Sequence, residues 1–341
     1  MPETRFASQG LSGSDLRSPA EVTGRLLAIQ AQDLRGARLA VRSRLADTVG
    51  SPAASQVDQD LNQGTMVVGW LNRGTLHMVR SEDYGWLHAI TGPRQVTANR
   101  TRLRQEGVSE AQAEKGVQLI GKTLADGPAL RNDLKAILES AGIPVAGQAM
   151  VHILYLASIL GLIVRGPMIG GEQGFVLVRD WLGEPVAFDP ETYLPELARR
   201  YLAGHGPAGD RDLAAWAGIP IGQARKGLDG IAGETVEAGG LVDLKDRPKT
   251  RPASPIRLLG PFDPVLHGWA SRDWLIPDAQ GRGVVTTNGL FRPSILVGDR
   301  IVGTWAMPAG KIELKPFGRL AAPVAKELQA EEERVREYLE R

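Results

Sequence analysis

Apolar positions in the first ninety residues follow two different periods. Residues 19–29 and 34–45 place apolar side chains every three or four positions, which predicts two amphipathic helices. Residues 66–79 contain two β-rich runs around the turn Asn72-Arg73-Gly74, a pattern typical of a β-hairpin. Helices followed by a hairpin make a winged helix, so we expect a first winged-helix unit over residues 1–92.

The same pattern returns twice along the chain. Helices are predicted over residues 130–140 and 147–160, and β-rich runs at 162–165 and 175–178 flank a glycine-rich turn at 168–174. A weaker copy begins near residue 194, with helix, turn and helix in 206–231 and a hairpin over 236–244. These copies predict winged helices over residues 93–187 and 188–247, related by pattern and not by sequence repeat.

The last third of the chain has a different character. Residues 248–255 are rich in proline and predict a linker, and residues 256–317 are strand-rich with turns at Gly260-Pro261, 278–283 and Gly298-Asp299. We expect a small β-barrel or a curled sheet in this region, with the barrel domain spanning 248–320. Residues 321–341 form a charged amphipathic pattern that predicts a C-terminal helix. The predicted fold class is α+β.

Composition narrows the class of protein. With 43% apolar and 23% charged residues, the chain is expected to fold as a soluble protein. The longest apolar run, residues 153–164, is too short to span a bilayer, and no apolar signal region begins the chain. Cysteine is absent and the five histidines are scattered, so we expect a cytoplasmic protein with no metal and no other cofactor.

The charge distribution is compatible with a DNA partner without requiring one. The net charge is only +1, but 31 of the 40 basic residues are arginine. Six arginines fall within residues 17–44 and four within 94–104. Arginine binds phosphate through a planar fork, which suits a DNA surface. A GC-rich genome explains the same bias equally well.

Two glutamines, Gln30 and Gln32, form the most informative local pattern. Inside a helix, side chains at i and i+2 diverge, whereas in an extended segment they point the same way. Asp33 is a good N-cap for the second predicted helix, which places the pair at the junction before that helix. Two amides can then face one cleft. A surface loop with two solvated amides is the alternative interpretation.

Around this pair the chain resembles the AlkZ-like DNA glycosylases, a family with a Gln-apolar-Gln motif. The motif is matched by Gln30, Ala31 and Gln32 in RLLAIQAQDLRGARLAVRSRL. Three further segments match in the family's order: LNRGTLHMVRSEDYGWL, FDPVLHGWASRDWLIP and NGLFRPSILVGDRIVGTW. The resemblance implies three tandem winged helices followed by a β-barrel. It also implies a monofunctional DNA glycosylase with Gln30 and Gln32 as catalytic residues.

The chemistry of an amide limits the substrates of such a site. Glutamine does not ionise near neutrality, so it positions and polarises a water without acting as a strong base. The leaving base must already be activated, as N7-alkylguanine is by its positive charge. The resemblance implies that the substrate is double-stranded DNA with bulky alkylguanine adducts or interstrand crosslinks. The role would be DNA repair or self-resistance to a genotoxic natural product.

Several side chains are candidate DNA contacts. Arg35 and Arg38 lie three apart on one helix face, where they can clamp phosphates or form a solvated face with a local pair to Asp33. The first hairpin contributes Arg73 and His77, although a structural histidine is the more common case. In the last region, Asn288 and Arg292 flank a hairpin that can probe the minor groove, or an ordinary turn whose Phe291 packs inside.

Other classes of enzyme lack their signals in this chain. Gly170-Gly171 is a turn and not a phosphate-binding loop, and there is no Gly-x-Ser-x-Gly nucleophile motif. The nine lysines are scattered, which favours hydrolysis over Schiff-base chemistry. The main alternative is a non-enzymatic winged-helix transcriptional regulator, which has no need of the glutamine pair. In either case we expect a monomer.

Overall fold

The computed structural model describes residues 2–46, 48–50, 52–184, 186–247, 255–277 and 281–341, and it mixes helices with strands. The chain divides into two compact units. Unit 1 combines Met1–Val57 with Leu194–Arg341, and unit 2 is Asp58–Tyr193, so the boundary falls inside α4 (Ala54–Asn62). Among the helices described, none has both the length and the apolar character needed to cross a bilayer.

Both hairpins predicted within unit 2 are present, and they join into one antiparallel sheet. Its strands are β2 (Met66–Leu71), β3 (Thr75–Arg80), β4 (Ile163–Ile169) and β5 (Glu172–Leu177), in the order β3-β2-β4-β5. Val68 pairs with Arg165 where the two hairpins meet. The second turn is shorter than the predicted 168–174, because the strands continue to the pair Ile169 and Glu172.

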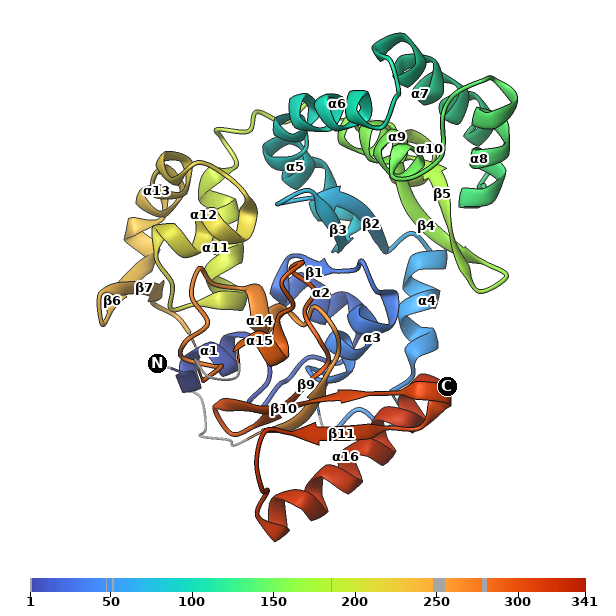
Figure 1. The fold of residues 1–341 in the computed structure, drawn as a ribbon. Helices are drawn as coiled ribbons and strands as arrows, with labels where there is room; N and C mark the ends of the chain where they lie inside the picture. Colours follow the sequence, from blue (N-terminus) through green and yellow to red (C-terminus); the bar gives the residue numbers. More distant parts are fainter. Residues whose placement is uncertain (1, 47, 51, 185, 248–254, 278–280) are drawn as a thin grey trace. The chain divides into compact units, whose positions relative to one another are not determined.

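Helices cover this sheet in unit 2 (Figure 1). The apolar pattern predicted α8 (Arg131–Ser140) and α9 (Ala149–Ile159), whose side chains enter the core of the unit. It did not predict four further helices, which precede or follow them: α5 (Ser81–Thr91), α6 (Val96–Gln105), α7 (Glu110–Leu124) and α10 (Val178–Leu182), with a short 3-10 turn at Pro93–Gln95.

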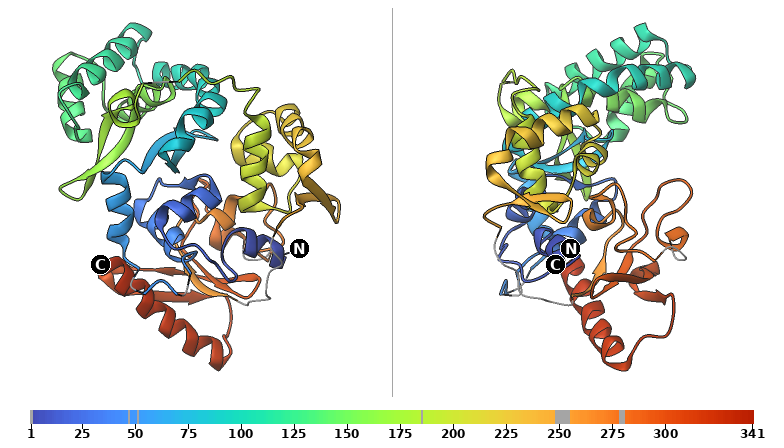
Figure 2. Two further views of the ribbon diagram at one scale, coloured as in Figure 1. Left: turned by 180° about the vertical axis from the view of Figure 1, so that it is seen from behind. Right: turned by 90° about the vertical axis from the view of Figure 1, so that its left-hand side faces the viewer.

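One order of elements recurs: helix, short strand or bridge, two helices, hairpin. In unit 2 it is α7, Ala129, α8, α9 and β4–β5, with Ala129 bridged to Phe175. In unit 1 it is α11 (Leu194–His205), Ala208, α12 (Asp210–Ala217), α13 (Ile221–Gly230) and the hairpin β6 (Thr235–Ala238)–β7 (Leu241–Leu244). Figure 2 shows α11–α13 as a group of yellow helices. The order is typical of winged helices, whose number and boundaries stay a prediction.

The start of unit 1 contains the segment with the two glutamines. It comprises α1 (Pro2–Ser8), α2 (Pro19–Leu26), β1 (Ile29–Gln30) and α3 (Leu34–Arg42). Ser18 caps α2 by accepting a hydrogen bond from the Glu21 amide. The helix ends before the predicted residue 29, because Leu27 adopts a φ of 64° and the chain then becomes extended.

The prediction of a closed β-barrel after residue 248 is not confirmed. Among the residues described, this region forms an open antiparallel sheet of β8 (Ile256–Leu259), β9 (Ser294–Val297), β10 (Arg300–Ala306) and β11 (Glu313–Pro316), with β8 and β11 at its edges. Residues 248–254 of the predicted linker and 278–280 of the predicted turn lie outside the described residues. The short helices α14 (Pro264–His267) and α15 (Gly281–Val284) and two 3-10 turns, Ala232–Glu234 and Pro308–Gly310, complete unit 1.

The C-terminal helix explains why this sheet stays open. Helix α16 (Ala322–Glu340) lies along the sheet in Figure 1 and places Leu328, Val335 and Tyr338 in one apolar cluster with Leu258 and Trp305. A sheet has to bury its apolar face against another layer. Here the helix supplies that layer, so the strands do not need to close on themselves.

Candidate active site

Gln30 and Gln32 lie where the sequence placed them, at the junction before α3. Gln30 is the last residue of β1, and Asp33 caps α3 by accepting a hydrogen bond of 3.0 Å from the Gly36 amide. The backbone of Asp33 is extended, with φ −117° and ψ 109°. The extended junction turns both side chains the same way, as their spacing predicted.

The two amides contact each other directly. Nε2 of Gln30 donates a hydrogen bond of 2.6 Å to Oε1 of Gln32. Gln30 is only 5% exposed, whereas Gln32 is exposed. The alternative of two solvated amides in a surface loop is therefore wrong for Gln30. A buried amide held by an exposed amide has a fixed orientation, which a solvated side chain does not.

The direction of this hydrogen bond decides which groups of the pair remain for a ligand. A glutamine side chain has one carbonyl oxygen and two amide hydrogens. The bond uses the carbonyl of Gln32 and one hydrogen of Gln30. It leaves the carbonyl oxygen of Gln30 as an acceptor and the amide hydrogens of Gln32 as donors. The pair therefore presents an acceptor beside a donor.

Helix α3 behind the pair is held at its first turn by a very close backbone approach. A Cβ on Gly36 would overlap the carbonyl oxygen of Pro261 and lie 2.9 Å from Pro261 Cγ. A Cβ on Gly260 would lie 2.9 Å from the carbonyl oxygen of Gly36. Glycine at both positions is what allows this contact.

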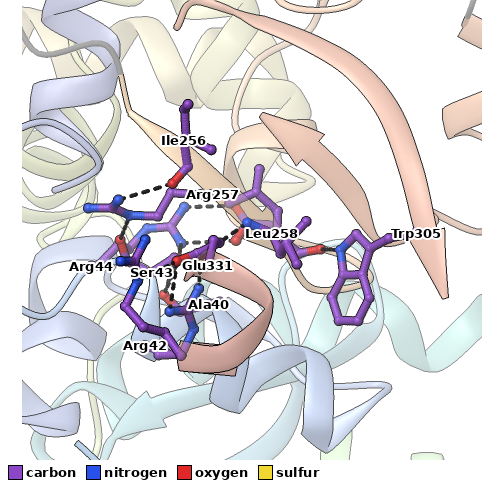
Figure 3. Close-up of polar contacts among 12 residues, drawn as sticks. Ala40, Arg42, Ser43, Arg44, Ile256, Arg257, Leu258, Trp305 and Glu331 are labelled. Atoms are coloured by element: carbon purple, nitrogen blue, oxygen red, sulfur yellow. Dashed lines mark hydrogen bonds and ion pairs between the residues drawn. The ribbon is translucent and has the colours of Figure 1, made fainter. Parts of the chain in front are cut away.

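The far end of α3 is anchored by two buried ion pairs, of which Figure 3 shows the one between Arg42 and Glu331. Arg42 binds the Glu331 carboxylate of α16, which also accepts a 3.1 Å hydrogen bond from the Leu258 amide. Desolvation alone would raise the pKa of Glu331, but the charge and hydrogen bonds of Arg42, with Arg257 and the Leu258 amide, hold that pKa below its usual value. Arg44 pairs with Asp263, and both side chains are fully buried.

Arg35 and Arg38 lie on α3, the helix that follows the glutamine pair. Arg35 is exposed and Arg38 is partly buried, and the carbonyl of Arg38 accepts a 2.9 Å hydrogen bond from Tyr338 Oη of α16. Asp33, the local partner in the alternative interpretation of these arginines, uses its carboxylate to cap the helix at Gly36.

In unit 2, Arg73 and His77 belong to the β2–β3 hairpin, with Arg73 partly buried in the turn. His77 is 1% exposed and its Nδ1 donates to the Thr75 carbonyl oxygen at 2.8 Å. Burial, followed by the nearby charge of Arg73, lowers the pKa of His77 to about 3, against the effect of the Thr75 hydrogen bond. His77 is therefore a neutral imidazole at physiological pH, with Nε2 as an acceptor.

Asn288 and Arg292 lie in a small hairpin of unit 1, and both side chains are exposed. The hairpin is closed by the bridge between Val285 and Phe291 and by a 2.9 Å bond from the Arg292 amide to the Val284 carbonyl. Phe291 is partly buried, with its ring 6.0 Å from that of Phe262. The two interpretations of this segment therefore coexist, because its base packs inward while its tip is exposed.

The sequence did not reveal which side chains the acidic residues near residues 263–273 bind. Two acidic residues of the last region, Asp263 and Asp273, have separate partners. Asp263 binds Arg44, and Asp273 instead accepts a 2.7 Å hydrogen bond from Ser271 Oγ. No signal in the sequence distinguishes a buried arginine such as Arg44 from its exposed neighbours. Within the described part of the chain, no group of acidic residues and histidines is placed to hold a metal ion.

Comparison with known proteins identifies the family. The family model described as "DNA glycosylase AlkZ-like" matches residues 23–338. The chain belongs to the AlkZ-like family. It is therefore a DNA glycosylase, an enzyme of DNA repair, and a transcriptional regulator is not favoured.

A sequence comparison and a structure comparison, both with Streptomyces sahachiroi AlkZ, support the assignment. A curated relative from Streptomyces sahachiroi, "Interstrand DNA cross-link repair glycosylase", is 25% identical over 340 residues, covering 92% of this chain and 88% of its own. The solved structure of Streptomyces sahachiroi DNA glycosylase AlkZ matches with a TM-score of 0.80 and 22% identity, over 98% of this chain and 95% of that chain. That structural likeness shows that the AlkZ-like glycosylase shares the AlkZ fold.

Proposed function

We propose that this glycosylase hydrolyses the N-glycosidic bond of bulky N7-alkylguanine in double-stranded DNA and unhooks interstrand crosslinks made through the same atom. The printed name of the curated relative, a crosslink repair glycosylase, supports the crosslink as a substrate class. A glycosylase that unhooks such crosslinks would also protect a cell from a genotoxic natural product that makes them. The observation on which the proposal depends is the hydrogen bond between Gln30 and Gln32.

The reaction suits a site without a strong base. N7 alkylation gives the base a positive charge, so the electrons of the C1′–N9 bond leave with the base and neutralise it. The sugar becomes cationic at C1′, and a water oxygen forms the new bond there. One proton of that water is released to solvent. The products are the neutral alkylguanine and an abasic sugar with a hydroxyl at C1′.

We assign different tasks to the two amides, which their hydrogen bond supports. The carbonyl oxygen left on Gln30 accepts a hydrogen bond from the attacking water. This hydrogen bond orients a lone pair of the water oxygen towards C1′. The donors left on Gln32 hold the water oxygen or a sugar oxygen. Holding reactants in the right geometry contributes up to about 7–11 kcal/mol of barrier reduction in ideal cases.

We assign the DNA contacts to the candidate side chains of each unit. In unit 1, Arg35 and Arg38 contact phosphates beside the lesion, and Asn288 and Arg292 at the hairpin contact the minor groove. In unit 2, Arg73 contacts the backbone and the neutral His77 accepts a hydrogen bond through Nε2. The exposure of Arg35, Asn288 and Arg292 supports these roles.

The decisive experiment removes the buried amide. Gln30→Ala is expected to lower the excision rate about 100-fold, because the water loses its orienting acceptor, while binding of undamaged duplex stays unchanged. Base release is measured by treating alkylated duplex with alkali and quantifying strand breaks. The matched control is Gln118→Ala on α7, which removes an exposed glutamine and keeps full activity. Excision by Gln30→Ala at the wild-type rate would overturn the assignment.

Substrate charge gives an independent arm of the same assay. Uracil in DNA is a neutral base and lacks the activation on which the amides rely, so it should be released far more slowly than N7-alkylguanine. Release of uracil at a comparable rate would require a stronger base than Gln30. A regulator would leave every duplex intact.

A further inference from the structure

We propose that Arg44 and Asp263 are positioning residues that set the hairpin at residues 285–291 relative to the Gln30–Gln32 pair. This inference rests on the proposed function, since it assumes that both parts act on one lesion. The two residues are far apart in the sequence and meet in a buried pair within unit 1.

The pair is built for fixed geometry. Nη1 and Nη2 of Arg44 donate to the two carboxylate oxygens of Asp263 at 3.0 and 2.7 Å. Arg44 also donates to the Ala40 carbonyl, Ser43 Oγ and Gln9 Oε1. Both charged side chains are 0% exposed. Replacing a buried ion pair with apolar residues is often neutral or stabilising, so stability alone does not account for this one.

Asp263 connects the ion pair to the turn at residues 260–263, which contacts the first turn of α3. Its Oδ1 accepts a 3.0 Å hydrogen bond from the Val265 amide and so caps α14. Two residues earlier, Pro261 makes the close backbone contact with Gly36. Gly36 in turn donates to Asp33, the residue directly after Gln32. The position of Asp263 therefore bears on the first turn of α3 and the glutamines before it.

The same turn supports the base of the hairpin. Phe262 adopts a φ of 57°, unusual for a residue other than glycine, and its carbonyl accepts a 2.8 Å hydrogen bond from His267 Nε2. The rings of Phe262 and His267 lie 6.0 and 5.5 Å from that of Phe291, and the Arg272 guanidinium lies 5.3 Å from it. Phe291 is thus bracketed by side chains of the segment that follows Pro261.

One short segment therefore contacts both parts of the proposed site. Its Pro261 supports the helix behind the amides, and its Phe262 supports the hairpin. A misplacement of about 1 Å at a reacting group costs on the order of 100-fold in rate. Loss of the ion pair between Arg44 and Asp263 is expected to let the segment around Pro261 and Phe262 shift. The shift would change the distance between the amides that hold the water and the hairpin.

The test compares two buried carboxylates that anchor the same helix. Asp263→Asn keeps the size and one acceptor but removes the charge that Arg44 binds. Glu331→Gln is the matched control, because it weakens the Arg42 pair, whose described hydrogen bonds and ion pairs join α3 to α16 and to Leu258 and not to residues 260–263. Single-turnover excision, the dissociation constant for undamaged duplex and the melting temperature are measured for each.

Asp263→Asn is expected to lower the single-turnover rate about 10-fold with duplex binding within about two-fold of wild type. Glu331→Gln is expected to lose melting temperature to a similar extent and to keep its rate. Equal rates for the two folded variants would overturn the positioning role. So would a loss in Asp263→Asn that appears only in DNA binding.

A double variant covers the case in which Asp263→Asn does not fold. Arg44→Met/Asp263→Leu fills the same space with apolar side chains and is expected to be folded, with its excision rate still lowered about 10-fold. Wild-type rate in this double variant would also overturn the inference. Gln30→Ala is assayed in parallel. If Gln30→Ala retains excision, the proposed function is wrong. If Gln30→Ala is inactive and Asp263→Asn is fully active, only the positioning role is wrong.

Discussion

At the scale of single residues, two side chains show how burial changes the chemistry that a residue type suggests. Gln30 is nearly buried, and its amide is oriented by Gln32, so a flexible polar side chain acquires one fixed acceptor. His77 is equally buried, and it loses the positive charge that would attract phosphate. Both residues were candidates in the sequence, but only the structure shows which atom of each makes a hydrogen bond within the protein.

The buried His77 predicts a pH dependence of stability. In the unfolded chain a histidine takes up a proton near its ordinary pKa of 6.5, while folded His77 resists protonation down to a pKa of about 3. Stability contributed by keeping it neutral is therefore complete above pH 6.5 and is lost as pH falls towards 3. At pH 5 the loss is about 2 kcal/mol.

Chemical denaturation of wild type and His77→Gln at pH 7 and pH 5 measures this effect. The variant should lose about 2 kcal/mol less than wild type between the two pH values, whatever its stability at pH 7. An identical decrease in both proteins would contradict the neutral, buried state of His77.

At the scale of elements, α3 is the helix on which the site depends. Its first turn abuts the backbone at Gly260 and Pro261, and Arg44, two residues past its last residue, binds Asp263. A helix fixed at both ends gives a rigid support for the residues before it. Catalytic groups need such support, because their geometry must be held within a fraction of an ångström.

Gly36→Ala tests the close approach at the start of α3. The added Cβ would overlap the Pro261 carbonyl, so we expect the free energy of unfolding to fall by about 1–3 kcal/mol. Gly222→Ala on α13 is the matched control, because its Cβ would meet nothing within 4 Å and should stabilise the helix by about 0.5–1 kcal/mol. Equal changes in the free energy of unfolding for the two substitutions would show that the turn at Gly260 and Pro261 moves aside without cost.

At the scale of the whole molecule, several arginines of the two arginine-rich segments form ion pairs with acidic residues of the same chain. Of the arginines within residues 17–44, Arg42 and Arg44 are buried in ion pairs. In the run at 94–104, Arg100 pairs with Glu110 and Arg102 with Glu106. The structure therefore corrects the picture of two basic clusters, and exposed arginines such as Arg35 and Arg292 are left as candidates for phosphate contacts.

A salt titration of duplex binding distinguishes arginines that contact phosphate from arginines that are paired within the protein. Each phosphate contact contributes about 0.9 to the slope of log affinity against log salt, so Arg35→Ala should reduce the slope by about that amount. Arg336→Ala on α16 is the control, since Arg336 pairs with Glu333. Unchanged slope in Arg35→Ala would remove it from the DNA interface.

Local patterns in the sequence determined the elements around the candidate site. The Gln-Ala-Gln spacing with Asp33 behind it predicted an extended junction and a capped helix, because capping and side-chain direction depend on neighbouring residues only. Asn72 and Gly74 likewise marked the first hairpin turn, where both adopt positive φ. The family resemblance carried by these segments is confirmed over residues 23–338.

Tertiary structure alone decided the rest. Whether a strand-rich segment closes into a barrel depends on what else covers its apolar face, and here α16 covers it with Leu328 and Val335. Whether an arginine meets phosphate or a buried carboxylate depends on residues far along the chain, as Arg44 and Asp263 show across 219 positions. Such long-range contacts leave no local periodicity, since they are chosen by the packing of the folded chain as a whole.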